Sequence, residues 1–395
     1  MPGSVIVAGA RTPIGKLSGA LAGFSAAELG GLAIKEALAR AGVAPDQVDY
    51  VIMGQVLLAG TGQVPARQAA VAAGIPMSVP ATVVNKVCLS GLNAIYQADL
   101  MISAGDADIV VAGGMESMTN APHLLLGARA GYRLGGGKLE DALMYDGLED
   151  AHSHEAMGKD SESYMPEFPA VTRARQDEFA AESHERAARA TKDGLLAEEI
   201  VPVEIPQRKG DPIIFSTDEG VRPGTTAESL GGLRPAFVSE GGSITAGNAS
   251  QISDGASAVI VMSPAAAARL GVEPLGTVVS YGMVAGPQNT CLMTQPSRST
   301  LKALGKADLQ VKDAKLFEFN EAFAAVALAS IDDLGISADT VNVNGGAVAL
   351  GHPIGASGNR VALTLMYELR RRGGGIGVAA LCGGGGQGDA LVVRV

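Results

Sequence analysis

Residues 81–113 read ATVVNKVCLSGLNAIYQADLMISAGDADIVVAG, and this stretch decides the fold. The β-branched run at 81–84 predicts a buried strand, and the small apolar residues at 89–104 predict a helix. A second buried strand is predicted at 108–112. A strand, a helix and a further strand in this order are typical of the βα units that surround a largely parallel sheet.

The same alternation extends over the residues that precede this stretch. Strands are predicted at Ser4–Ala8 and Tyr50–Met53, and helices at Ala26–Ala41 and near Ala66–Ala73. It resumes after Asp254. The strands predicted there are Ala258–Met262, Thr277–Tyr281, Leu316–Phe319, Gly377–Leu381 and Leu391–Val393.

The composition changes between these two regions, from about residue 122 to residue 246. Glycines run at 135–137, charges cluster, and a polar helix predicted at Arg173–Ala190 stands among extended pieces interrupted by proline. The sequence therefore predicts two α/β cores that flank an inserted, looser domain.

The overall composition excludes several classes of protein. Of 395 residues, 47% are hydrophobic and 18% are charged, which is typical of a globular chain with a large core. The formal net charge of −11 implies no broad basic surface for nucleic acid. No window reaches about 18 unbroken apolar residues, so we expect no membrane span, and the N-terminal residues lack the pattern of a signal peptide.

The three cysteines, Cys88, Cys291 and Cys382, are odd in number and far apart. This usage argues against a disulfide framework and a structural zinc site, and we expect reduced thiols in a cytoplasmic protein. Gly383, Gly385 and Gly388 satisfy the dinucleotide pattern G-x-G-x-x-G, but the residues after them predict a strand where a dinucleotide site needs a helix.

Four motifs carry residues with useful chemistry. Cys88 lies between a predicted strand and a predicted helix, where helix N–H groups favour a thiolate. His352 lies among glycines that leave room for a substrate. Cys382 ends a predicted strand and precedes four glycines whose N–H groups could stabilise an oxyanion. Asn320 stands where a strand becomes a helix, a position that a simple N-cap also explains. Each motif alone is better explained as structure.

Together these motifs resemble the thiolase family. The segments VCLSG, NEAFA, GHPIGASG and CGGGGQG occur in the family's order and spacing, as do RTPIGK, GGMESM and TAGNAS. The resemblance spans nearly the whole chain, and within the family it is greatest to the acetyl-CoA acetyltransferases. It implies a thiolase-like fold of two similar α/β halves, with mixed sheets layered with helices, plus an inserted loop domain. The implied domains are 1–121, completed by about 247–271, then the CoA-binding loop domain 122–246, and 272–395.

The resemblance implies a reversible Claisen condensation of two acetyl-CoA to acetoacetyl-CoA and CoA, without metal or other cofactor. Cys88 is the implied nucleophile, activated by His352, and Cys382 is the implied base. Two oxyanion sites are also implied, one formed by His352 and a water held by Asn320 and the other by the N–H groups of Cys88 and Gly384. The implied CoA-binding residues are Met157, Arg222, Phe237, Ala246, Ser250, Ala322 and Phe323. Relatives are dimers or tetramers, so a homotetramer built as a dimer of dimers is expected.

The chain departs from the family pattern at three places. Ala156 stands where many relatives have histidine, and His154 lies two residues earlier. Gly383 replaces a common isoleucine, which predicts a looser turn at Cys382. The segment 291–296 replaces a more glycine-rich segment of the acyl pocket.

Two other functions remain open. A broad 3-ketoacyl-CoA thiolase of fatty-acid degradation differs only in its chain-length preference. A carrier of CoA or lipid with a thiolase shape would not require the two thiols, the imidazole and the amide. A zinc site made of Cys88, His352 and Cys382 lacks a fourth ligand and fits no compact motif.

Overall fold

The computed structural model describes residues 3–287 and 289–395. Its main element is a ten-stranded sheet with the order β12-β13-β14-β11-β1-β10-β5-β3-β4, in which β2 pairs with β10. The strands are β1 (Val5–Arg11), β2 (Gly15–Lys16), β3 (Tyr50–Gly54), β4 (Ala81–Val84), β5 (Ile109–Ser117), β10 (Ser253–Met262), β11 (Gly276–Ala285), β12 (Ala314–Phe319), β13 (Ile376–Gly383) and β14 (Gln387–Arg394).

The sheet consists of two halves with the same pairing pattern. In the first half, β3 is parallel to β5, β5 is antiparallel to β10, and β10 is antiparallel to β1. In the second half, β12 is parallel to β13, β13 is antiparallel to β14, and β14 is antiparallel to β11. The halves join where Val5 and Ile6 of β1 pair with β11. The predicted pair of similar α/β cores with mixed sheets is confirmed.

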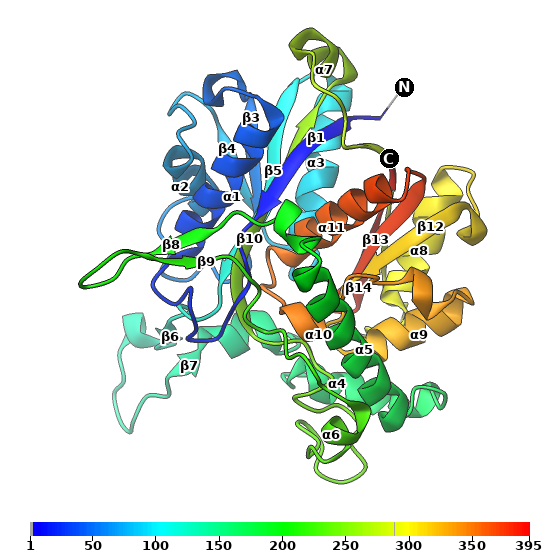
Figure 1. Ribbon diagram of the computed structural model, residues 1–395. Helices are drawn as coiled ribbons and strands as arrows, with labels where there is room; N and C mark the ends of the chain where they lie inside the picture. Colours follow the sequence, from blue (N-terminus) through cyan, green and yellow to red (C-terminus); the bar gives the residue numbers. More distant parts are fainter. Residues whose placement is uncertain (1–2, 288) are drawn as a thin grey trace.

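Helices form layers between and outside the two halves of the sheet. The helix α3 packs against α11 between the halves, whereas α1 and α2 cover the outer face of the first half and α8 and α9 cover that of the second (Figure 1). Apolar side chains fill each of the three interfaces. The helices of the two cores are α1 (Ala26–Ala41), α2 (Pro65–Ala72), α3 (Ser90–Ala104), α7 (Pro264–Leu270), α8 (Gln295–Lys306), α9 (Ala324–Leu334), α10 (Ala347–Leu350) and α11 (Ser357–Arg371).

The four strands predicted near the N-terminus all run in the same direction, as expected for a largely parallel arrangement. β3 is parallel to β4 and β5, and β1 has the same direction because β10 is antiparallel to both β1 and β5. The strand β10, which comes from beyond residue 246, lies antiparallel between β5 and β1. Several predicted strands are too short: β5 continues through Gly113 and Gly114, and β10 begins at Ser253. A Cβ on Gly113 would lie 2.6 Å from the sulfur of Met53. These glycines are therefore part of a tightly packed strand and do not mark a loop.

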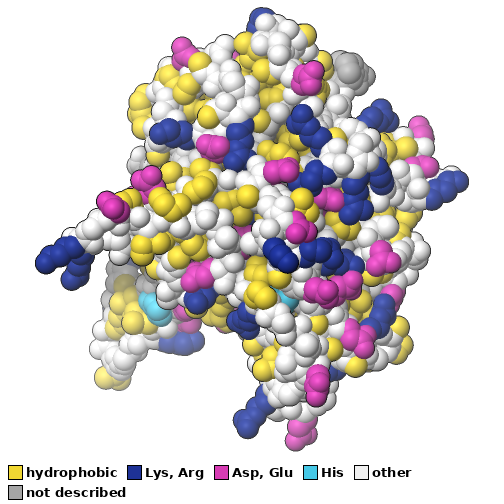
Figure 2. Space-filling view, in the orientation of Figure 1, with side chains coloured by type: hydrophobic (Ala, Val, Ile, Leu, Met, Phe, Trp, Pro, Cys, Tyr) yellow, Lys and Arg dark blue, Asp and Glu magenta, His cyan; other side chains and the backbone are white. Residues whose placement is uncertain are grey.

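Residues 122–246 contain shorter elements and two hairpins that project from the cores (Figure 1). The polar helix predicted at Arg173–Ala190 forms α5 (Arg173–Lys192), and the side chain of Thr172 caps it by accepting the N–H of Arg175. Basic and acidic side chains are interspersed on the face shown in Figure 2. The remaining elements are α4 (Met157–Tyr164), α6 (Ala227–Gly231), the hairpin β6–β7 (His123–Leu124 and Glu140–Asp141) and the hairpin β8–β9 (Val203–Ile205 and Ile213–Phe215).

Candidate active site

The two central helices, α3 and α11, meet at their first turns. A Cβ on Gly91 of α3 would lie 2.8 Å from the backbone nitrogen of Asn359, and a Cβ on Gly358 of α11 would lie 2.4 Å from that of Leu92. The two backbones therefore touch where only glycine fits. Cys88 lies just before α3 and His352 just before α11, so this contact brings the two segments together.

A tight turn presents Cys88 at the end of β4. Val87 adopts φ +50°, a left-handed conformation that is costly for a β-branched residue. Its N–H donates to the side chain of Asn85, at 3.1 Å. The hydroxyl of Ser90 donates to the Val87 carbonyl at 2.6 Å and accepts the N–H of Lys86 at 2.8 Å. These bonds hold the strained turn and direct Cys88 into a cavity.

Hydrogen bonds fix the imidazole of His352. Its Nδ1 lies 2.6 Å from the hydroxyl of Ser357, which donates its own proton to the Pro353 carbonyl at 3.0 Å. The hydroxyl must therefore accept from Nδ1–H, which leaves Nε2 as the proton-accepting nitrogen. Burial and the nearby Arg360 guanidinium lower the pKa of His352 to about 3. The ring is neutral at physiological pH.

Cys382 lies at the end of β13, 1% exposed. Burial raises its pKa, and the neighbouring Cys88 sulfur raises it further. Burial also raises the pKa of Cys88, to about 11, against the opposing effect of hydrogen bonds from the N–H groups of Cys88 and Gly384. The two thiols therefore share one environment, and two backbone donors point at the Cys88 sulfur.

The turn after Cys382 is not loose, although the glycine at position 383 predicted a looser turn. A Cβ on Gly383 would lie 2.7 Å from Cγ of Leu89, which occupies the space that a larger side chain would take. The turn after Cys382 is therefore packed against the residue that follows Cys88.

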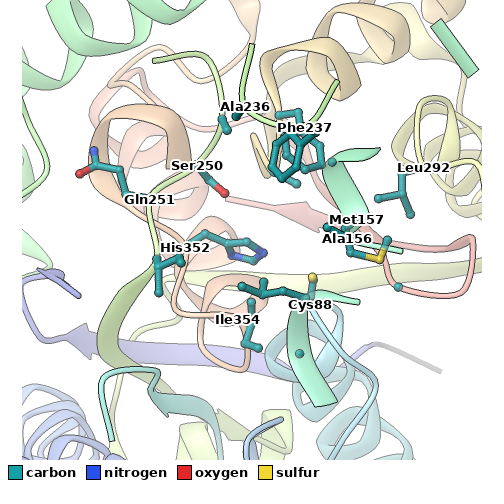
Figure 3. A pocket seen from close by; sticks show the side chains of 18 of the residues that line it. Cys88, Ala156, Met157, Ala236, Phe237, Ser250, Gln251, Leu292, His352 and Ile354 are labelled. Atoms are coloured by element: carbon teal, nitrogen blue, oxygen red, sulfur yellow. The ribbon is translucent and has the colours of Figure 1, made fainter. Parts of the chain in front are cut away.

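A cavity of about 560 Å³ contains the predicted residues (Figure 3). The side chains of Cys88 and His352 point into it, and Phe237 and Met157 lie across from them. Phe237 packs edge-on against Phe323, with ring centroids 6.0 Å apart. Eleven of the twelve predicted site residues line this cavity: Cys88, His352, Cys382, Gly384, Met157, Arg222, Phe237, Ala246, Ser250, Ala322 and Phe323.

Asn320, the twelfth predicted residue, is fully buried and contacts the site through His352. Its Nδ2 lies 3.3 Å from Nε2 of His352. Its Oδ1 has no hydrogen-bond partner among the described residues. A buried acceptor of this kind normally binds a water molecule, which fits the water that the family resemblance places there.

Two residues in or beside the site were not predicted from the sequence. Glu116 is buried and accepts the N–H groups of Val56, Leu57 and Gly355, so it holds the loop that follows His352. Burial raises its pKa to about 7. Lys16 lines the cavity beside Leu17. The signal for both lay in the motifs GGMESM and RTPIGK, which gave no residue roles by themselves.

The other departures from the family pattern lie around the same cavity. Ala156 lines it, whereas His154 is exposed and does not replace the missing histidine. In the segment 291–296, Leu292 faces the cavity, while the half-buried Cys291 packs against the apolar core beside β12 and β13.

We predict that the rate at which iodoacetamide alkylates Cys88 keeps rising at pH values where the rate for an ordinary cysteine has already levelled off. Only the thiolate reacts, and a pKa of about 11 keeps the thiol protonated at neutral pH. The rate is expected to rise about tenfold per pH unit from pH 7 to 10. Peptide mass spectrometry measures it, and the denatured chain, with an ordinary pKa of about 8.5, is the control. A plateau below pH 8 would instead reveal a preformed thiolate–imidazolium pair.

Two structural features can be stated for the described part of the chain. Within residues 3–287 and 289–395, no cluster of three or more His, Cys, Asp and Glu side chains has a geometry able to hold a metal ion. Over the same residues, no helix has the length and apolar character needed to cross a membrane.

Comparisons with known proteins point to one family. The family model "Thiolase, N-terminal domain" matches residues 4–265, and the family model "Thiolase, C-terminal domain" matches residues 272–395. A probable acetyl-CoA acetyltransferase of Mycolicibacterium smegmatis is 58% identical over 99% of this chain and 100% of its own length. An acetyl-CoA acetyltransferase of Cupriavidus necator is 53% identical over 99% of this chain and 98% of its own.

A solved structure is similar over the whole molecule. The crystal structure of the Bacillus anthracis acetyl-CoA acetyltransferase matches with a TM-score of 0.95 and 40% identity, covering 100% of this chain and 99% of that one. Family models that match both halves, relatives of high identity and this structural match lead to one conclusion: the chain belongs to the thiolase family.

Proposed function

We propose that this chain is an acetyl-CoA acetyltransferase that interconverts two acetyl-CoA molecules with acetoacetyl-CoA and CoA. The observation that carries the proposal is the meeting of Cys88, His352 and Cys382 around one cavity. The full-length relatives named acetyl-CoA acetyltransferase support the choice of substrate. Neither a metal nor another cofactor enters the proposed reaction.

In the first half-reaction, the Cys88 sulfur attacks the thioester carbonyl of acetyl-CoA while its proton passes to Nε2 of His352. The Ser357 hydrogen bond to Nδ1 supports this assignment of the acceptor nitrogen. The oxygen of the tetrahedral intermediate accepts hydrogen bonds from the N–H groups of Cys88 and Gly384. Removing one such donor typically costs about 10²- to 10³-fold in turnover.

In the second half-reaction, Cys382 acts as the base. As a thiol of raised pKa, it must first lose its proton, and the departing CoA sulfur is the acceptor available at that moment. The resulting Cys382 thiolate removes a proton from the methyl group of a second acetyl-CoA. The enolate oxygen is stabilised by protonated His352 and by the water bound to Asn320. The enolate carbon then attacks acetyl-Cys88, the C–S bond breaks, and Cys88 recovers its proton from His352.

We further infer that the segment 122–246 holds the CoA arm against the two cores, 1–121 with 247–271 and 272–395. Met157 and Phe237, which this segment supplies to the cavity, suit the uncharged pantetheine. Arg222 suits a phosphate, because a guanidinium binds phosphate oxygens in pairs. The backbone N–H of Arg222 donates a hydrogen bond to Nδ1 of the buried His184, at 3.2 Å.

A homotetramer in the cytoplasm remains our prediction for the assembly and the compartment. Support for an assembly comes from the β6–β7 hairpin, whose connecting segment exposes large apolar side chains to solvent, Leu134 being 99% exposed. An exposed apolar arm on a projecting hairpin is typical of a surface that another subunit covers.

The proposed function is tested by brief exposure of the protein to acetyl-CoA, followed by intact and peptide mass spectrometry. We expect one acetyl group, on Cys88. In thiolysis, kcat/KM for acetoacetyl-CoA is expected to exceed that for a long-chain 3-ketoacyl-CoA by at least about tenfold, because a pocket fitted to a short chain penalises extra methylenes.

Each alternative gives a different result in these assays. Equal or reversed preference for the long chain would favour a thiolase of fatty-acid degradation. Binding of CoA without acetylation or thiolysis, after reduction of the thiols, would favour a carrier.

A further inference from the structure

A buried ion pair joins the Cys88 turn to β14. Nζ of Lys86 lies 2.7 Å and 2.8 Å from the two carboxylate oxygens of Asp389. Asp389 is fully buried, and the Lys86 side chain is 21% exposed. The hydroxyl of Tyr281 donates to the same carboxylate at 2.7 Å, and its ring stacks on Tyr96 with centroids 4.3 Å apart. None of these four residues lines the cavity, so the proposed reaction does not use them.

One partner of this ion pair belongs to the segment that carries Cys88, and the other lies on β14, the strand paired with the one that carries Cys382. Lys86 precedes Cys88 by two residues. Asp389 pairs with Leu381 across β13 and β14, and the next pair in the register is Cys382 with Gly388. The ion pair therefore bridges the first half of the sheet and the second half close to both thiols.

The proposed chemistry depends on the relative position of these two segments. The oxyanion site of acyl transfer takes one N–H from Cys88 and one from Gly384, and condensation needs both sulfurs at one substrate. The turn at Val87 is strained, so its conformation persists only where its neighbours hold it. Ser90 holds the turn from the helix side, and Lys86 joins it to β14 through a directed, charged hydrogen bond.

We propose that Lys86 and Asp389 act as positioning residues that fix the Cys88 turn against the Cys382–Gly384 turn. This inference rests on the proposed function, since it concerns the same reaction. A displacement of about 1 Å between reacting groups can cost 10²-fold in rate. A buried ion pair is weak evidence of a role in stability, because apolar residues of similar volume often replace one without loss. Such a replacement does, however, remove the directed bond between Lys86 and Asp389.

The test compares kcat and KM for acetoacetyl-CoA thiolysis in Lys86→Met and in the double variant Lys86→Met/Asp389→Leu. The double variant leaves no unpaired buried charge, so it keeps the test valid if the single variant does not fold. Turnover is expressed per folded molecule, with the folded fraction measured by circular dichroism, which removes the effect of a smaller folded fraction. We expect kcat per site to fall about 10- to 100-fold, with KM within about twofold.

Two further variants distinguish positioning from a general loss of packing. Lys86→Arg keeps a donor for Asp389 and is expected to restore kcat to within about fivefold of the wild type. Lys306→Met removes a lysine that donates to the carbonyl of Tyr281 at 2.7 Å but does not touch the Cys88 turn, and kcat is expected to remain unchanged.

The outcomes separate this inference from the proposed function. A wild-type protein without thiolysis or acetyl-Cys88 would overturn the proposed function and the positioning role with it. With an active wild type, a double variant that turns over normally per folded molecule overturns the positioning role alone. A Lys86→Arg variant whose kcat is as low as that of Lys86→Met also overturns the positioning role.

Discussion

Replacement of Cys88 by alanine is expected to abolish acetylation and to lower kcat for thiolysis by about 10⁶-fold, the scale of losing the nucleophile in enzymes of this type. The alanine keeps the turn and the backbone N–H at residue 88, but no atom remains there to form the thioester. The measurement is steady-state thiolysis of acetoacetyl-CoA together with mass spectrometry after exposure to acetyl-CoA.

A matched control exists in the same chain. Cys291→Ala removes a half-buried thiol that does not line the cavity, so turnover within about threefold of the wild type is expected. Normal acetylation within the cavity of the Cys88→Ala protein would show that another residue is the nucleophile, and the proposed roles of both thiols would then be wrong.

Replacement of Cys382 by alanine is expected to separate the two half-reactions. Acetylation of Cys88 should continue, because the nucleophile, His352 and the N–H of Gly384 all remain and CoA can leave as a thiolate that solvent protonates. Condensation and exchange of the acetyl methyl protons with solvent are expected to fall about 10²- to 10⁴-fold, the usual contribution of a general base. Removing one buried sulfur at the end of β13 leaves the strand pairing intact.

Proton NMR in deuterium oxide measures the methyl exchange, and mass spectrometry measures the acetylation of the same sample. If Cys382→Ala exchanges methyl protons at the wild-type rate, Cys382 is not the base. If the variant also loses acetylation, the leaving CoA sulfur depends on Cys382 for its proton more strongly than this scheme assumes.

The sequence predicted most of the elements because the apolar periodicity is strong in the two cores. The helix at Ala26–Ala41 has the predicted bounds, and Ser25 and Glu28 form the capping box that begins it. The direction of the strands was harder to predict. Whether β10 runs parallel or antiparallel depends on how the chain returns from the insertion, and no local pattern records that path.

The candidate site was predicted through family motifs, since each motif by itself has an ordinary structural explanation. The motifs gave the residues with reactive groups. They did not give residues such as Glu116 and Ser357, whose effect depends on which backbone groups and ring atoms they reach in three dimensions. The ion pair of Lys86 with Asp389 spans 303 positions and has no local signature at all.

The glycine contact between α3 and α11 has a consequence for how substrate preference can diverge. Main-chain atoms meet there without room for a methyl group, so the spacing of the reactive pair cannot be adjusted by small changes of side-chain size. The walls that face the acyl and pantetheine groups come largely from other segments, including Met157, Phe237 and Leu292. New chain-length preferences are therefore accessible by exchanging these peripheral segments, while the chemical step is inherited unchanged.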